Sequence, residues 1–122
     1  MTDKVFVYGT LKKDECSVKF LKNCVFEGVG TVTNSALINL KAFPGMILGS
    51  FNKKYWAKGE IYTITDGILN ILDVIEAEGR LYKRIIAPVE TDSGTVWCWT
   101  YIFLAPMPEK ILIRNGHWRS LC

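Results

Sequence analysis

The apolar residues of this chain come in short runs separated by turn-forming residues, and only one stretch repeats them with the period of an amphipathic helix. The run from Val5 to Tyr8 is rich in β-branched and aromatic residues and stops at Gly9, which is typical of a buried first strand. The pattern therefore predicts an α+β protein that is mostly β, with a small curled mixed sheet or partly closed barrel and one or two short helices.

Several further strands are expected downstream of this run. Residues 25–48 should form short strands broken at Gly28, Gly30, Asn34-Ser35 and Phe43-Pro44-Gly45. Residues 58–64 alternate polar and apolar side chains, which is the period of a strand. Residues 81–89 and 96–104 flank an Asp92-Ser93-Gly94 turn and predict a hairpin, in which Pro88 favours a strand edge or end.

Two helices are expected. Residues 16–24 favour a short one. A clearer one should begin where Thr65 or Asp66 caps the first turn with its side chain, and should stop at Gly79. Its apolar positions recur at helical spacing, and they are Ile68, Leu69, Ile71, Leu72 and Ile75.

Composition limits the kind of protein this chain forms. Its 122 residues suit one domain spanning 1–122, and no repeat or linker divides them. Charged residues make up 22%, and the net charge of +3 is spread over scattered basic residues. We expect neither nucleic-acid nor membrane binding, because no dense basic patch and no run of about 18 apolar residues is present. The pattern does not indicate an oligomeric state.

The cysteines and the N-terminus bear on location. Cys16, Cys24, Cys98 and Cys122 form neither a CxxC pair nor a zinc-like spacing with the single histidine. We interpret them as reduced thiols, although their even number leaves a disulfide open. The first residues lead directly into a strand without a signal-peptide pattern. These features predict a cytoplasmic protein without a metal site.

One carboxylate falls on the apolar face of the main helix. At about 100° per residue, with Ile68 at zero, Leu72 and Leu69 lie at about 40° and 100°. Glu76 lies between them at about 80°, inside the apolar stripe, whereas Asp73 lies just outside it. Loss of water disfavours a charged carboxylate and raises its pKa, which suits a group that trades protons near neutral pH. The alternative is a frayed helix end, with Glu76 solvated or paired with Arg80, Lys83 or Arg84.

Five short motifs carry a resemblance to a known family. They occupy residues 5–12, 43–45, 59–62, 72–76 and 81–84, and read VFVYGTLK, FPG, GEIY, LDVIE and LYKR. In order and spacing they resemble the gamma-glutamyl cyclotransferase-like (AIG2-like) family, and within it the small gamma-glutamylamine cyclotransferases. The resemblance extends to about residue 104 and implies the fold of that family.

The resemblance also implies the residues of a site. The family's catalytic glutamate closes the LDxxE string, which is Glu76 here. Its YGTL-type loop binds the γ-glutamyl group and corresponds here to Tyr8, Gly9, Thr10 and Leu11, and Tyr82 matches an aromatic position near the site. Two positions depart from the family pattern, because Asp14 and Ala77 stand where glycine is frequent.

The implied reaction is an internal aminolysis that needs no cofactor. The α-amine of a small γ-glutamyl substrate attacks its own γ-carbonyl, forming 5-oxoproline and releasing an amine, with one carboxyl moving the protons. Two other functions remain open. One is a non-catalytic protein of the same fold that binds or sequesters a small metabolite. The other is an interaction module that uses the strand face shared by Trp97, Trp99, Tyr101 and Phe103.

Overall fold

A computed structural model describes residues 3–9, 12, 21–39, 44–48, 55–65, 67–76, 78–104, 112–113 and 118. Its elements follow in the order β1 (Lys4–Val7), β2 (Val25–Val32), β3 (Ser35–Asn39), β4 (Pro44–Leu48), β5 (Ala57–Thr63), α1 (Ile68–Ile75), β6 (Tyr82–Thr91), β7 (Gly94–Phe103) and β8 (Leu112–Ile113). The mostly β character expected from the sequence is confirmed.

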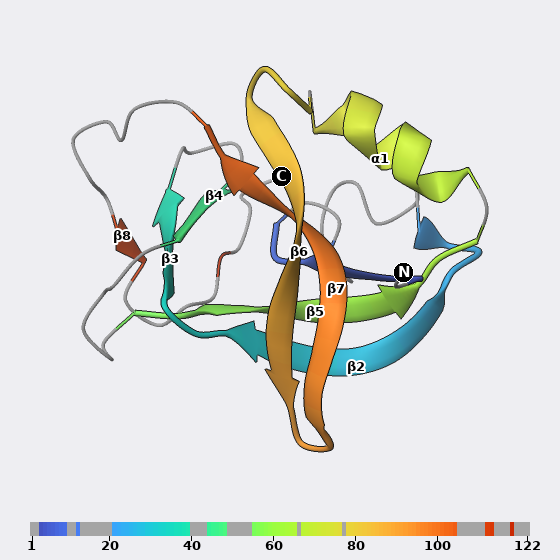
Figure 1. Ribbon diagram of the computed structural model, residues 1–122, viewed down its shortest axis with the longest axis horizontal. Helices are drawn as coiled ribbons and strands as arrows, with labels where there is room; N and C mark the ends of the chain where they lie inside the picture. The colour runs from blue at the N-terminus through green and yellow to red at the C-terminus, as the bar shows by residue number, and fades with distance from the viewer. Residues whose placement is uncertain are drawn as a thin grey trace.

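Five of the strands form a closed barrel (Figure 1). Their order is β1-β5-β2-β6-β7, and the barrel closes where β1 meets β7 in parallel, with Val5 opposite Trp99. The other pairs in the barrel are antiparallel. A smaller sheet with the order β4-β3-β8 lies beside it. The expected curled mixed sheet or barrel is thus present, and its barrel is closed.

Strand β1 is buried on both faces because it lies between two apolar clusters. Its alternating side chains divide between them. Phe6 and the adjoining Tyr8 pack into one cluster with residues of the barrel and the small sheet. Val5 and Val7 pack into the other, together with Leu72 of α1. The sequence expectation of a buried first strand is confirmed.

The hairpin of β6 and β7 confirms the predicted turn, and of the two positions expected for Pro88 it excludes the strand end. Thr91 pairs with Gly94 across a two-residue turn, and Gly94 has a φ of 113° that favours glycine. Pro88 does not end the strand, since β6 continues to Thr91. Because β6 pairs with β2 only at Glu90, it has few ladder hydrogen bonds on that side for a proline to remove.

Three of the expected strand breaks, at Gly28, Gly30 and Pro44-Gly45, are wrong. Strand β2 continues through both Gly28 and Gly30. Gly28 lies at a bulge and has a φ of 133°, so its conformation bends the strand without ending it. Pro44 and Gly45 are the first residues of β4 and not an interruption. The expected break at Asn34 is present, and this residue has a φ of 52° between β2 and β3.

Helix α1 differs from its prediction at both ends. Gly67, with a φ of 85°, occupies the N-cap position, and no side chain caps the first turn. Thr65 is therefore not the predicted cap, and Asp66 lies outside the described residues. The helix ends at Ile75, four residues before Gly79, where it was expected to stop. The second predicted helix, over residues 16–24, lies mostly outside the described residues.

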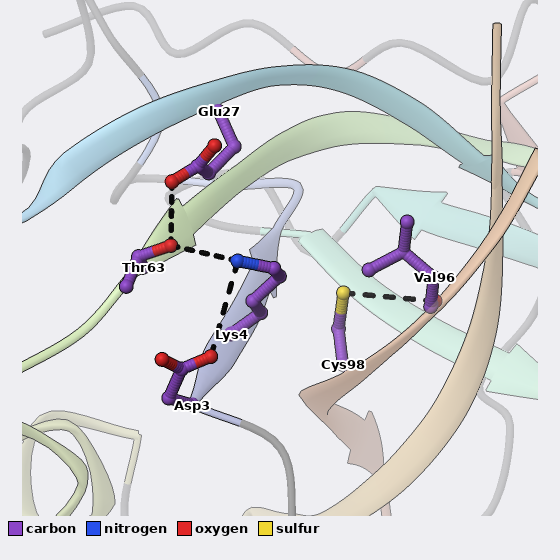
Figure 2. Close-up of polar contacts among 6 residues, drawn as sticks. All are labelled: Asp3, Lys4, Glu27, Thr63, Val96 and Cys98. Carbon is purple, nitrogen blue, oxygen red and sulfur yellow. Dashed lines mark hydrogen bonds and ion pairs between the residues drawn. The ribbon is translucent and has the colours of Figure 1, made fainter. Parts of the chain in front are cut away.

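Polar contacts link the strand ends near the N-terminus (Figure 2). The Lys4 ammonium of β1 donates to Thr63 Oγ1 at 2.9 Å, and Thr63 donates to Glu27 Oε2 of β2 at 2.6 Å. These bonds connect three neighbouring strands of the barrel. In the part of the chain that the structure describes, no helix has the length and apolar character needed to span a membrane.

Candidate functional site

The predicted site lies where three elements begin or end. Tyr8 and Gly9 directly follow β1, Glu76 is the C-cap of α1, and Tyr82 begins β6. The Glu76 amide still donates to the Leu72 carbonyl at 2.9 Å, so the last helical hydrogen bond fixes its backbone. Because Leu72 is fully buried, this bond holds the Glu76 backbone close to the buried face of the helix.

Glu76 is a partly buried carboxyl with a shifted pKa. Burial raises its pKa from 4.5 to about 7, because removal of water disfavours the charged form. Among the described residues, its side chain makes no hydrogen bond or ion pair that would offset this loss of water. In particular, Arg84, which the alternative interpretation offered as a partner, is paired with Asp73. The site thus contains a carboxyl that is about half protonated at neutral pH.

Three tyrosines from different strands lie within electrostatic reach of this carboxyl. Burial raises the pKa of Tyr8, and the negative charge of Glu76 raises it further. The same two causes, in the same order, raise the pKa of Tyr82. The pKa of Tyr101 is also raised, mainly by burial and its bond to Asp73, with a smaller contribution from Glu76. Residues from β1, β6 and β7 therefore converge on the end of α1.

Two of these tyrosines bind the backbone at the start of β4. The Tyr8 hydroxyl donates to the Tyr101 carbonyl at 2.6 Å and accepts from the Met46 amide at 3.2 Å. The Tyr82 hydroxyl donates to the Pro44 carbonyl. Both hydroxyls are thus held by backbone groups, and their rings form fixed walls of the site. This arrangement explains why the YGTL, FPG and LYKR motifs occur together in the chain.

Gly9 also lies against β4. A Cβ atom at this position would lie 2.8 Å from Pro44 Cδ and 2.9 Å from its Cγ, which is too close for any larger residue. The Gly9 carbonyl accepts from the Lys12 amide at 3.0 Å, so a turn follows the strand immediately. Lys12 is buried, and its ammonium donates to the Trp118 carbonyl at 2.6 Å. Thr10 and Leu11, which complete the predicted loop, lie outside the described residues.

A polar cluster beside Glu76 was missed by the sequence reasoning. Asp73 Oδ2 is 3.1 Å from a guanidinium nitrogen of Arg84, and Asp73 Oδ1 accepts from the Tyr101 hydroxyl at 2.7 Å. The guanidinium carbon also lies 4.7 Å from the centroid of the Trp99 ring. The one signal in the sequence was the Asp of the LDxxE string, since its partners come from distant strands.

The aromatic face of β7 is mostly covered. Tyr101 is buried, Trp99 lies under Arg84, and the Phe103 ring meets the Tyr82 ring edge-on with centroids 5.8 Å apart. Trp97, near the hairpin turn, is the exposed member of the set, with 57% of its surface accessible. This face is therefore mainly a wall of the core and not an open stacking platform.

A separate hollow of about 620 Å³ lies on β2, β5 and the end of β6. It is lined by charged side chains of both signs, including Lys58, Glu60 and Glu90. Neither Glu76 nor the three tyrosines line it, so it is not the site described above. Among the described residues, no group of three or more histidine, cysteine or acidic side chains is arranged to hold a metal ion.

Comparisons with known proteins agree with the fold. The family model described as "Gamma-glutamyl cyclotransferase, AIG2-like" matches residues 5–120. The gamma-glutamylcyclotransferase family protein YtfP of Escherichia coli is 28% identical over 115 residues, covering 94% of this chain and 95% of that protein. Its solution structure superposes with a TM-score of 0.70. An AIG2-like protein from Mus musculus has a TM-score of 0.84 at 25% identity, covering 98% of this chain and 90% of that one.

Proposed function

Because this chain belongs to the gamma-glutamyl cyclotransferase, AIG2-like family, we propose that it releases 5-oxoproline and a free amine from a small γ-glutamyl compound, with Glu76 as the acid-base catalyst. The observation that carries the proposal is the partly buried Glu76 carboxyl, whose pKa of about 7 results from loss of water. We take residues 1–122 as one domain and the cytoplasm as its location. Cys24 and Cys98, the cysteines that the structure describes, are free thiols.

The chemistry requires one group that both accepts and donates a proton. A carboxylate with a pKa near 7 removes a proton from the substrate α-amine, which is mostly protonated at neutral pH. The freed amine then forms a bond to the γ-carbonyl carbon and closes a five-membered ring. As the bond from that carbon to the leaving nitrogen breaks, protonated Glu76 returns its proton to the leaving nitrogen. The ring nitrogen then gives up its second proton through the Glu76 carboxylate to the released amine, which departs as its ammonium ion. The same carboxyl is thereby restored.

The surrounding residues hold the substrate bent for this step. Amino and carbonyl groups of one molecule react much faster when a site keeps them in contact, so positioning supplies much of the acceleration. We assign this role to Tyr8, Gly9, Thr10 and Leu11, with Tyr82 as a wall. The close packing of Gly9 on Pro44 supports the assignment, because it leaves the backbone after β1 with no side chain between it and β4.

The decisive experiment assays purified protein for 5-oxoproline against a panel of γ-glutamyl amines and γ-glutamyl peptides. We expect release from at least one of them, and we expect Glu76→Gln to lower kcat by about 10²- to 10⁴-fold, the range typical of a lost acid-base group. Glu90→Gln, which changes an exposed carboxylate of the hairpin, is the matched control and should keep the wild-type rate. A Glu76→Gln variant with the wild-type rate would contradict the mechanism.

A second candidate function is binding without turnover. The residues that we assign to substrate positioning would hold a small metabolite equally well, since a fold does not fix an activity. Calorimetric binding of one panel compound, with no 5-oxoproline formed over long incubation, would favour this function over catalysis.

A further inference from the structure

Among the described residues, Arg84 belongs to the polar cluster beside Glu76, and it forms its ion pair with Asp73. Arg84 and Tyr82 are two residues apart on β6, so their side chains leave the strand on the same face. The negative charge of Glu76 contributes to the raised pKa of Tyr82 on that face. Tyr101 pairs with Arg84 across the hairpin. The charge of Arg84 lowers the pKa of Tyr101, and the charge of Glu76 raises it. The Arg84 guanidinium and the Glu76 carboxyl therefore both lie within electrostatic reach of Tyr101.

Asp73 is what holds it. Asp73 and Glu76 are three residues apart at the end of α1, a spacing that puts their side chains on neighbouring positions of one helix face. Asp73 Oδ2 takes the guanidinium at 3.1 Å, and Tyr101 fixes the other carboxylate oxygen at 2.7 Å. Trp99 lies against the guanidinium, and the Arg84 amide donates to Glu78 Oε2 at 3.2 Å.

We propose that Asp73 is a positioning residue that binds Arg84 and thereby keeps this cation away from the Glu76 carboxyl. The inference rests on the proposed function only for its effect on catalysis. Among the described residues, the titratable groups whose charges interact with Glu76 are Tyr8, which follows β1, Tyr82 from β6 and Tyr101 from β7, and all three tyrosines are neutral at physiological pH. With Arg84 held, no cation among the described residues offsets the burial that raises the pKa of Glu76.

The test is an NMR titration of the Glu76 carboxyl in protein labelled with ¹³C at glutamate side chains. In Asp73→Asn, Arg84 is free to pair with Glu76, and an opposite charge at that distance should lower the pKa of Glu76 by about 1 to 2. In Asp73→Asn/Arg84→Met the cation is gone, and the pKa should return close to the wild-type value. Asp92→Asn, which removes a carboxylate from the exposed hairpin turn, is the control for general charge effects and should leave it unchanged.

A second pair of variants retains Asp73 in case Asp73→Asn does not fold. Lysine is a mobile point charge that a carboxylate holds less firmly than the arginine fork. Arg84→Lys should therefore lower the pKa of Glu76, and Arg84→Met should not. Equal values in these two variants, or a Glu76 pKa in Asp73→Asn that matches the wild type, would overturn the proposal.

Catalysis gives a second readout. In Asp73→Asn the acidic limb of the kcat/KM profile should move to lower pH by the same amount as the titration, and the added Arg84→Met change should move it back. If the wild type releases no 5-oxoproline but the titrations behave as expected, the proposed function fails and the role of Asp73 stands. If release occurs but the titrations are flat, the proposed function stands and the role of Asp73 is wrong.

Discussion

At the scale of single residues, the main feature of this molecule is a partly buried carboxyl that makes no ion pair with any described residue. Burial raises the pKa of Glu76 to about 7, and such a shift has a cost in stability as well as a use in chemistry. In the unfolded chain the carboxyl ionises near 4.5, so between about pH 4.5 and 7 the folded state binds more protons than the unfolded state. Stability contributed by this residue therefore falls as pH rises through that range.

This cost is measurable without any substrate. Glutamine mimics the protonated carboxyl at every pH, so Glu76→Gln should be more stable than the wild type at pH 8 and nearly equal to it at pH 5. The shift corresponds to a change of about 2 kcal/mol in the difference between the two proteins across that interval, an upper figure because the carboxyl is partly exposed. Urea unfolding of both proteins at the two pH values checks it, and a difference independent of pH would contradict the raised pKa.

Residue identity at the site was partly visible in the sequence. The helical period placed Glu76 on the apolar face, and the LDxxE string selected the same residue; its catalytic role stays a prediction. Asp73 was placed just outside the stripe, and its exposure is intermediate. Its importance was not predictable from periodicity, because the contacts that give it meaning come from Arg84 and Tyr101, on strands that follow later in the chain.

At the scale of elements, the start of β4 is where the barrel and the small sheet meet the site. Gly9 packs on Pro44, and a Cβ on Gly45 would lie 3.0 Å from the Phe103 side chain of β7. The sequence showed the FPG string as a probable turn. It did not show that Pro44 and Gly45 begin a strand. At this position Gly45 allows close packing against β7 and does not produce a turn in its own backbone.

The contact of Gly9 with Pro44 gives a prediction for both elements. In Gly9→Ala the new methyl group would meet the Pro44 ring at 2.8 Å, so β1 and β4 must separate. Overpacking of this kind typically costs about 1 to 3 kcal/mol, and we expect it to lower 5-oxoproline release as well. Replacing Pro44 by alanine removes the clashing ring carbons, so Gly9→Ala/Pro44→Ala should recover part of the stability lost. Chemical denaturation of the four proteins in the cycle gives the coupling, and strictly additive losses would show that the two residues do not meet.

Element boundaries were predictable where turn chemistry is local. The Asp92-Ser93-Gly94 turn fixed the hairpin, because the alternation on either side matched a two-residue loop. The start of α1 was missed, because a glycine with a positive φ replaced the expected side-chain cap. The course of β2 was missed for a related reason: Gly28 and Gly30 serve a bulge and close packing, which resemble breaks when seen only as letters.

At the scale of the whole molecule, two tyrosine hydroxyls join the closed barrel to the three-stranded sheet. Tyr8 links the Tyr101 carbonyl of the barrel to the Met46 amide of the small sheet, and Tyr82 reaches the Pro44 carbonyl. The two sheets thus depend on residues that also line the candidate site. Damage to the site should therefore loosen the assembly of the sheets.

Tyr8→Phe tests this dependence. The change leaves the Met46 amide and the Tyr101 carbonyl without their partner in a buried place, which should cost about 1 to 3 kcal/mol. Hydrogen exchange of the Met46 amide should become about tenfold faster or more, whereas amides in the middle of the β6–β7 hairpin should change little. Tyr62→Phe, which removes a hydroxyl bonded to Glu60 at 3.2 Å, is the matched control. Unchanged exchange at Met46 in Tyr8→Phe would show that the hydroxyl does not join the sheets.

The parallel contact of β1 with β7 joins segments that lie far apart in the sequence. Val5 pairs with Trp99, a residue more than ninety positions later. We therefore expect the barrel to close around β1 only after β7 has been synthesised. Until the hairpin has emerged from the ribosome, the valine and aromatic side chains of β1 are accessible to chaperones or to other nascent chains. A truncated product that lacks the hairpin would therefore expose the apolar side chains of β1, and it would contain Glu76 without Tyr82, Arg84 and Tyr101.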